Sequence, residues 1–199
     1  SEDWERQMLI KANYLCESES LYNKFSDSVS RFIYPATFSV SPVEQIKKLK
    51  ASIEQRCKSE DNIKFISGGI RDIEFSLQAL QLLNGGKDLS IRTGNSLDAI
   101  DKLLNKNILS EEESEIFKSA YVFYRRVEHY LQLMNDQQTH TIPAEGEVVE
   151  KLAHFLNFKD LKSFKNKLNI STDKEQSIYN SIVGIKDSAD SKNDFNKII

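Results

Sequence analysis

The sequence predicts an all-α protein, an antiparallel up-and-down helical bundle with an N-terminal helical arm. Only seven glycines and three prolines occur among 199 residues, about half the average share, so long uninterrupted elements are expected. Apolar residues recur every three or four positions along most of the chain, which is the spacing of one helix face. An all-β sandwich is disfavoured, because it needs a turn every ~8–12 residues.

The first two helices are expected within residues 4–16 and 21–32. Residues 4–16 mix apolar and charged side chains in a helical rhythm. The second segment carries apolar residues in steps of four, four and three: Leu21, Phe25, Val29 and Phe32. It ends before Tyr34-Pro35, because a residue that precedes proline is pushed out of the α region.

Capping residues predict where the third helix begins. Ser41 can cap it, Pro42 suits the first helical position, and Glu44 completes a Ser-x-x-Glu capping box. An apolar face follows at Val43, Ile46, Ile53 and Cys57. The polar run 58–62 then reads as a loop.

Glycines bound the fourth helix on both sides. Gly68-Gly69 precedes it and Asn84-Gly85-Gly86 follows it, residues that tolerate the left-handed conformation of a helix end. Apolar residues lie on more than one of its faces, which is typical of a helix at the centre of a bundle. A shorter helix is expected over residues 96–106.

The longest helix is expected to begin at a second capping box, Ser110 with Glu113, and to end before Pro143. Its predicted seam has heptad spacing: Ile116, Ala120, Phe123, Val127, Tyr130 and Met134. Two more helices are predicted over residues 147–156 and 160–185. Polar Ser171 and Glu175 interrupt the apolar stripe of the last one, and residues 186–199 are expected to form a flexible tail.

Composition and motifs disfavour several classes of protein. The formal net charge of −3 lacks the basic excess of a nucleic-acid-binding domain, and no apolar run reaches the ~20 residues that span a bilayer. The acidic start is no secretory signal, and its missing initiator Met suggests a fragment. Two widely separated cysteines, Cys16 and Cys57, fit a reducing cytoplasm. Metal binding is disfavoured, because the three histidines lack i, i+4 spacing.

Polar residues at the start of the fourth helix leave two interpretations open. Two glycines entering a helix expose backbone N–H groups that favour an anion, and Arg71 could clamp a phosphate or carboxylate. Alternatively, the glycines make a tight turn, and Asp72 and Glu74 only complement the helix dipole. The local sequence favours the turn.

Cations in two other segments are candidates for contact with a nucleotide or a partner. Arg125 and Arg126 lie in the middle of the longest helix, where they could meet a polyphosphate or pair with Asp72, Glu74 or Glu128. Arg6 and Lys11 lie near the start of the chain, where a missing partner domain is expected. The chain contains no GxSxG, Walker-type, GxGxxG or HExxH motif, so no catalytic residue is assigned to it.

These segments, in this order, resemble the glutamine synthetase adenylyltransferase/deadenylylase family. The likeness runs from Trp4 to about Pro143. The matching stretches are Trp4-Glu5-Arg6-Gln7, Ile10-Lys11-Ala12, Asp61-Asn62-Ile63-Lys64, Gly68-Gly69-Ile70-Arg71-Asp72-Ile73-Glu74-Phe75, Gly85-Gly86, Arg125-Arg126-Val127-Glu128-His129 and Asp136-Gln137-Gln138-Thr139-His140.

The resemblance implies a bifunctional parent enzyme. Members carry two nucleotidyltransferase domains, each followed by a helical domain, and they transfer AMP to and from a tyrosine of glutamine synthetase. A PII-type signalling protein and glutamine control them. The glycine-rich stretch and the Asp-Gln-Gln-Thr-His ending are more similar to the N-terminal, deadenylylating half.

The chain departs from the family because it has no Gly-Ser loop followed by Asp-x-Asp carboxylates, which hold two metal ions in relatives. The fragment alone is therefore expected to be inactive and without cofactor, with Mg²⁺ and ATP or phosphate used by the parent. Residues 1–60 are interpreted as an arm or linker from a missing nucleotidyltransferase domain, and residues 61–185 as the bundle.

The leading hypothesis is a helical domain of that enzyme, flanking its catalytic cleft. Arg71, Arg125 and Arg126 would neutralise phosphate or position the target loop. Asp72, Glu74 and Glu128 would hold these arginines in place. The expected partners are glutamine synthetase, a PII-type protein and the adjoining nucleotidyltransferase domain, with no nucleic acid and no membrane. The alternative is a non-catalytic scaffold that binds the PII-type protein or the partner half.

Overall fold

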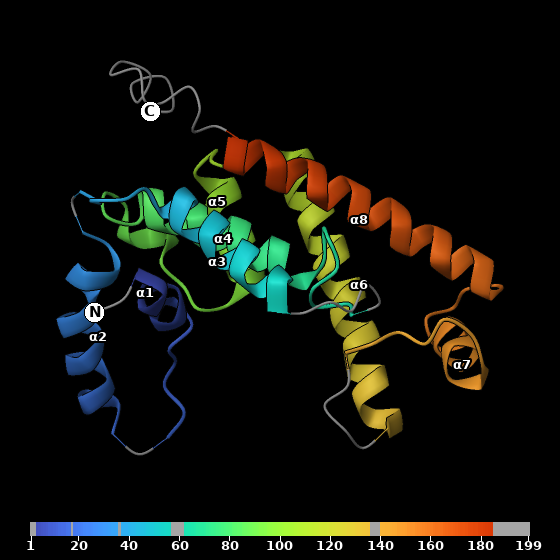
Figure 1. Ribbon diagram of the computed structural model, residues 1–199. Coiled ribbons are helices and arrows are strands. Elements are labelled where there is room, and N and C mark those ends of the chain that lie inside the picture. The colour runs from blue at the N-terminus through green and yellow to red at the C-terminus, as the bar shows by residue number, and fades with distance from the viewer. Residues whose placement is uncertain (1–2, 17, 36, 57–61, 136–139, 185–199) are drawn as a thin grey trace. The chain divides into compact units, whose positions relative to one another are not determined.

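The computed structural model describes residues 3–16, 18–35, 37–56, 62–135 and 140–184 (Figure 1). Within these ranges there are eight α-helices and one short 3-10 helix, η1: α1 (Asp3–Ile10), α2 (Glu19–Ile33), α3 (Pro42–Arg56), α4 (Ile70–Asn84), η1 (Leu89–Ile91), α5 (Ser96–Asn105), α6 (Glu111–Asn135), α7 (Glu147–Phe155) and α8 (Leu161–Gly184). The described residues contain no strand, only an isolated bridge between Asn62 and Thr141. The predicted all-α class is confirmed.

Most helix boundaries agree with the capping and breaking residues of the sequence. α4 begins directly after Gly68-Gly69 and ends at Asn84, and α6 begins directly after Ser110. α2 ends at Ile33, and Tyr34 leaves the helical region with φ −120° and ψ 67°. Local chemistry therefore determines these ends, as the pre-proline restriction at Tyr34 illustrates.

The first helix is shorter than predicted, because α1 ends at Ile10 and residues 12–16 are not helical. Contacts outside the helix engage the residues that would have continued it. The Tyr22 hydroxyl donates a hydrogen bond to the Ala12 carbonyl at 3.1 Å, and Lys11 Nζ donates to Ser96 Oγ at 2.7 Å. The expected helix over residues 4–16 is therefore corrected to its first two turns.

The chain divides into two compact units, each formed from separated stretches of sequence. Unit 1 comprises the described parts of residues 1–52, 75–111 and 182–199, and unit 2 comprises those of 53–74 and 112–181. The division cuts through α4, whose first residues belong to unit 2 and whose remainder belongs to unit 1. The three-part division expected from the sequence stays a prediction.

Unit 1 packs around a cluster of buried side chains from α1, α2 and α4: Ile10, Ile33, Tyr34 and Leu82. Arg92 covers this cluster. Its guanidinium lies 4.4 Å from the centroid of the Tyr34 ring, and it donates to the Gly85 carbonyl at 2.7 Å and to Ser30 Oγ at 2.6 Å. Burial raises the pKa of Tyr34 to about 12, so its hydroxyl stays protonated.

Unit 2 packs α6 through a seam that differs in register from the prediction. The fully buried positions are Phe117, Ala120, Tyr124, Val127 and Leu131. Ala120 and Val127 were predicted correctly. The predicted Ile116, Phe123 and Tyr130 are each replaced in the seam by the next residue along the chain. Met134, predicted as core, is 46% exposed. Because α6 is apolar on several faces, packing against other helices decides which register is buried.

The last helix, α8, also differs from the sequence prediction. Ser171 and Glu175, predicted to interrupt its apolar stripe, are 3% and 1% exposed. They lie one turn apart on the face that is buried within unit 2. Polar residues therefore form part of this core.

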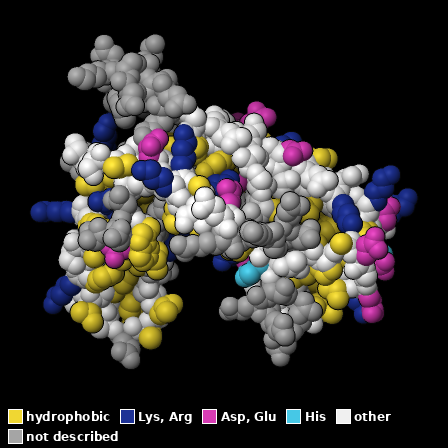
Figure 2. Space-filling model, viewed as in Figure 1, with side chains coloured by type: hydrophobic (Ala, Val, Ile, Leu, Met, Phe, Trp, Pro, Cys, Tyr) yellow, Lys and Arg dark blue, Asp and Glu magenta, His cyan; other side chains and the backbone are white. Residues whose placement is uncertain are grey.

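Hydrophobic side chains are also exposed at the surface, notably over α1, α2 and the segment that joins them (Figure 2). Leu15 is 90% exposed and Leu21 is 67% exposed. Among the residues that the structure describes, no helix has the length and apolar character to cross a bilayer. The predicted tail over residues 186–199 and most of the predicted loop 58–62 lie outside the described residues.

Candidate functional site

The glycine-rich turn before α4 uses its own backbone N–H groups. Gly68 has a φ of +73°, in the left-handed region, and its N–H donates to Asp72 Oδ2 at 2.7 Å. The N–H of Gly69 donates to the Ile66 carbonyl at 2.9 Å. The next two amides also have carbonyl partners, at 3.5 Å and 3.4 Å, in Ile63 and Lys64.

Close packing against α8 explains why Gly68 is a glycine. A side chain there would overlap the backbone carbonyl of Thr172, and a Cβ on Gly69 would lie 2.7 Å from the Ile63 carbonyl oxygen. Asp72, which is 3% exposed, therefore occupies the position that an external anion would need. The geometry favours the tight turn over the anion cradle as the interpretation of this stretch.

The middle of α6 carries a polar network centred on Arg125. Its guanidinium donates to Glu128 Oε2 at 2.6 Å, to Glu74 Oε1 at 3.0 Å and to the Tyr121 hydroxyl oxygen at 3.0 Å. Tyr121 in turn donates to Glu74 Oε1 at 3.3 Å. We call Glu74, Tyr121, Arg125, Glu128 and His140 the arginine network. It connects the N-terminal part of α4, through Glu74, to α6.

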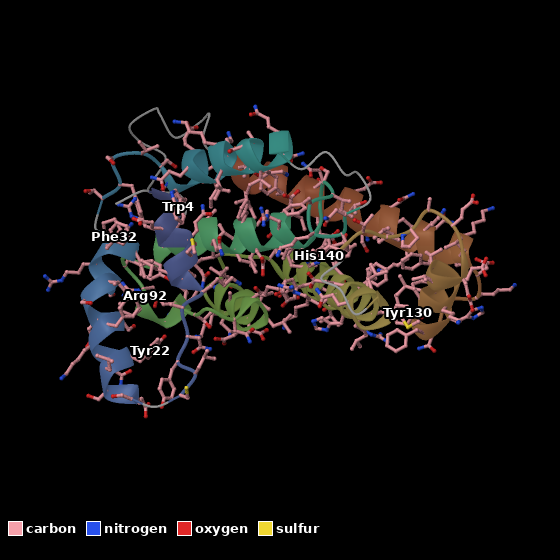
Figure 3. The ribbon with its side chains drawn as sticks, turned by 60° about the horizontal axis from the view of Figure 1, so that its bottom comes forward. Trp4, Tyr22, Phe32, Arg92, Tyr130 and His140 are labelled. Atoms are coloured by element: carbon pink, nitrogen blue, oxygen red, sulfur yellow. The ribbon has the colours of Figure 1, made fainter. Side chains whose placement is uncertain are left out.

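His140 completes the arginine network from the segment after α6 (Figure 3). Its Nδ1 lies 2.9 Å from Glu128 Oε1, close enough for an ion pair when the imidazole is protonated, although the ring is not aligned for a hydrogen bond. Backbone contacts hold it there, because the Ile63 N–H donates to the His140 carbonyl at 2.9 Å. Glu128, which is 3% exposed, thus faces two potentially cationic groups.

Electrostatics keeps the guanidinium of Arg125 charged. Burial opposes the charged form, but the hydrogen bonds with Glu128 and Tyr121 outweigh it and raise the pKa of Arg125. Of the three predicted supporting acids, Glu74 and Glu128 contact Arg125, and Asp72 accepts from the Gly68 N–H. Arg125 is therefore bound to carboxylates of its own chain.

The neighbouring Arg126 lies in a different environment. It is exposed, and its guanidinium lies 5.7 Å from the centroid of the Phe155 ring in α7. Among the described residues it has no ion-pair partner. Arg71 is half-buried, with its guanidinium 4.5 Å from the centroid of the Phe65 ring. Arg126 is thus the more accessible of these two cations.

The two remaining candidates, Arg6 and Lys11, lie in unit 1. Arg6 Nε donates to the Phe32 carbonyl at 2.9 Å, and its guanidinium lies over the rings of Phe32 and Phe38, at 4.8 Å and 5.6 Å from their centroids. Lys11 donates to Ser96, as described above. Both side chains therefore join segments of unit 1, and the structure brings neither into the arginine network.

A second buried polar pair in unit 2 was missed by sequence reasoning. The Tyr124 hydroxyl donates to Glu175 Oε2 at 2.8 Å, between α6 and α8. Burial raises the pKa of Glu175 to about 7, against the hydrogen bond from Tyr124, which lowers it. Burial and the nearby Glu175 charge raise the pKa of Tyr124. The only sequence indication was the i, i+4 spacing of Ser171 and Glu175 within an apolar stripe.

No metal site emerges from the described part of the chain, which contains no group of three His, Cys, Asp or Glu side chains placed to hold an ion. The two polar clusters contain the ion pairs of Arg125 and the hydrogen bond between Tyr124 and Glu175. These contacts join α6 to the start of α4 and to α8, while the side chain of Arg126 is exposed.

One family model matches the part of the chain that contains the arginine network. Residues 42–180 match the family model described as GlnD PII-uridylyltransferase. The match covers more than two thirds of the chain, including α4, α6 and α7, and it places the chain in a family related to nucleotidyltransferases. Arg6 and Lys11 lie before the matched region. The glycine-rich turn before α4, the arginine network and Arg126 all lie within it. The chain belongs to the GlnD PII-uridylyltransferase family.

Proposed function

We propose that this chain is a helical domain that accompanies a nucleotidyltransferase domain in an enzyme regulating nitrogen assimilation. Within that group, we propose that the enzyme transfers AMP to and from a tyrosine of glutamine synthetase, and that the chain belongs nearer its deadenylylating half. The family match over residues 42–180 supports the broad assignment. The ordered motifs at Gly68–Phe75, Arg125–His129 and Asp136–His140 support the narrower one.

The arginine network is the observation that carries this proposal. It joins the two most distinctive motif stretches, since Glu74 comes from the first and both Arg125 and Glu128 come from the second. A network that uses its charges internally fixes the angle between helices but performs no bond-making step. The proposed role is therefore to support a neighbouring active centre, where Mg²⁺ and ATP or phosphate would bind, and to present Arg126 to a partner.

The proposal is tested by measuring which nucleotide the enzyme uses and which protein it modifies. The whole polypeptide that contains this chain is incubated with ATP or UTP labelled at the α-phosphate, and with either glutamine synthetase or a PII-type protein. We expect label from ATP on glutamine synthetase, and its release by inorganic phosphate. Label only from UTP, and only on the PII-type protein, would contradict the adenylyltransferase assignment while agreeing with the family.

The second candidate function is a non-catalytic scaffold that binds a PII-type protein or the partner half. The pairing of Arg125 with Glu74 and Glu128 favours it, because a guanidinium that binds carboxylates of its own chain is less available to substrate. Binding of the chain to a PII-type protein, measured by calorimetry with and without glutamine, tests it. Tight binding by the 199-residue chain, with no effect of the chain's removal on nucleotidyl transfer, would favour the scaffold.

A further inference from the structure

One side of α6 and the adjoining face of α7 form a surface that combines exposed apolar side chains with cations. We define the α6–α7 surface by its members, which all belong to unit 2: Val122, Arg126, Tyr130, Leu133, Lys151 and Phe155. Leu133 is 83% exposed and Phe155 is 54% exposed. Hydrophobic side chains gather between the lower end of α6 and α7 in Figure 2.

The geometry of the two helices brings these side chains together. Val122, Arg126 and Leu133 are spaced by four and seven residues, so they follow one stripe of α6. The rings of Tyr130 and Phe155 lie with their centroids 5.0 Å apart, which connects that stripe to α7 (Figure 3). Lys151 lies one turn before Phe155 on α7. An aromatic pair is thus flanked by two cations.

The charges of this surface are incompletely compensated. Lys151 has an exposed partner in Glu147, at 2.6 Å, and such surface pairs contribute little. Arg126 has only the Phe155 ring among the described residues, and His129 is exposed on the same side of α6. An incoming carboxylate would therefore find a cation that has no acid partner in the described part of this unit.

The shape of the surface favours a protein segment over a small ligand. From Val122 to Leu133 the stripe extends about 16 Å along the helix axis at 1.5 Å per residue. Small ligands prefer a concave site that encloses most of their surface, whereas an amphipathic segment covers such a stripe with side chains one turn apart. A second copy of this chain is disfavoured, because a two-fold contact centred on the stripe would bring Arg126 against Arg126.

We propose that the α6–α7 surface docks an acidic amphipathic segment of a partner protein. Carboxylates of that segment pair with Arg126 and Lys151, and its apolar side chains cover Leu133 and Phe155. The segment belongs to the protein substrate, an assignment that rests on the proposed function. The structure thereby separates the two neighbouring arginines of α6 into one that stabilises the unit and one that recognises a partner.

The test uses the whole polypeptide with glutamine synthetase as the probe, and it measures both steady-state kinetics and direct binding. Arg126→Glu is expected to raise the KM for glutamine synthetase at least tenfold at low salt, with the difference shrinking at high salt, where charges are screened. Leu133→Ser is expected to raise it several-fold without that salt dependence. Neither variant should change the KM for ATP.

Lys162→Glu, a charge reversal at an exposed position of α8 in the same unit, is the matched control. It should leave unchanged the KM for glutamine synthetase, the direct binding of glutamine synthetase and the KM for ATP. Unaltered binding by Arg126→Glu and Leu133→Ser overturns the proposal, as does a parallel rise in the KM for ATP, which would indicate a nucleotide contact. Wild-type polypeptide that binds glutamine synthetase but transfers no AMP refutes the proposed function alone. Absence of wild-type binding to this probe overturns the docking proposal as well.

Discussion

Two polar clusters of unit 2, one partly buried and one buried, begin at adjacent residues of α6 and differ in the partners that they give to their acids. Arg125 enters the arginine network, where Glu74 and Glu128 surround a guanidinium. Tyr124 faces a different side of the helix, toward Glu175 of α8, and donates a hydrogen bond to its carboxylate at 2.8 Å. The first cluster pairs opposite charges, whereas the second contains an acid that accepts a hydrogen bond from a neutral hydroxyl.

The difference shows what controls the protonation of a buried group. Hydrogen bonds to ionised partners offset burial at Arg125, and the pKa of the cation is raised. At Glu175 the tyrosine hydroxyl offsets only part of the burial, so the pKa of the acid is raised to about 7. The charges of Lys167 and Lys174 also lower it, by less than the hydrogen bond from Tyr124 does. A buried acid beside a cation keeps its charge, and one beside a hydroxyl becomes sensitive to pH.

Breaking the arginine network is expected to have the largest effect. Arg125→Met removes the cation and leaves Glu128, which is 3% exposed, as a buried charge whose remaining ion-pair contact among the described residues is His140. We expect the free energy of unfolding to fall by about 3 kcal/mol, the cost of breaking a buried ion pair from one side. Denaturant titration at pH 8 measures it.

Arg126→Met is the matched control, since it makes the same substitution one residue along α6 at an exposed side chain. Its effect should stay within about 0.5 kcal/mol. Equal losses in the two variants would mean that the network contributes no more than surface packing does.

The second prediction concerns pH and Glu175. Because its folded pKa of about 7 exceeds the ordinary value of 4.5, the stability that it contributes is fully present below pH 4.5 and is lost as pH rises through 7. The wild-type free energy of unfolding should therefore decline between pH 5 and pH 8, by up to about 3 kcal/mol. Glu175→Gln should remove this decline and be the more stable protein at pH 8.

Denaturant titrations at several pH values measure the decline. Glu115→Gln, at an exposed position of α6, serves as the control and should retain the wild-type profile. A decline of the same size in Glu175→Gln would assign the pH dependence to another group.

Tyr124→Phe is expected to have the smallest effect and to sharpen the comparison. It removes the hydroxyl that lowers the pKa of Glu175, so the decline in stability should extend to higher pH. At pH 8 the lost hydrogen bond to a charged group should cost about 2 kcal/mol. Tyr121→Phe, within the arginine network, should leave the pH range of this decline unchanged. A change of that range in both variants would argue against a specific Tyr124–Glu175 contact.

Helix boundaries could be predicted from the sequence because their determinants are local. The glycines before α4, the Ser110 capping box before α6 and the proline after Tyr34 all act within a few residues of the end that they define. α1 was predicted too long, because a hydroxyl from Tyr22, ten residues further on, binds the Ala12 carbonyl. Contacts between residues far apart in the sequence cannot be predicted from the local spacing of apolar residues.

The candidate site could be predicted only in part for the same reason. Glu74, Arg125 and Glu128 were recognised as possible partners, since oppositely charged side chains on packed helices often form ion pairs. The tyrosine–glutamate pair was not recognised, because Tyr124 and Glu175 are 51 residues apart and each, viewed locally, looks like an ordinary core or surface residue. His140 was quoted for its motif, but its approach to Glu128 depends on the bridge between Asn62 and Thr141.

Three consecutive residues of α6 face three different surroundings: Tyr124 the packed interior, Arg125 the carboxylates and Arg126 the solvent. Each residue advances the helix by about 100°, so inserting one amino acid upstream in α6 would turn all three out of place together. Tyr124 would then meet the carboxylates, and Arg125 would meet water. Changes in length should consequently be accommodated in the connections on either side of α6, while the helix itself tolerates substitution but not insertion.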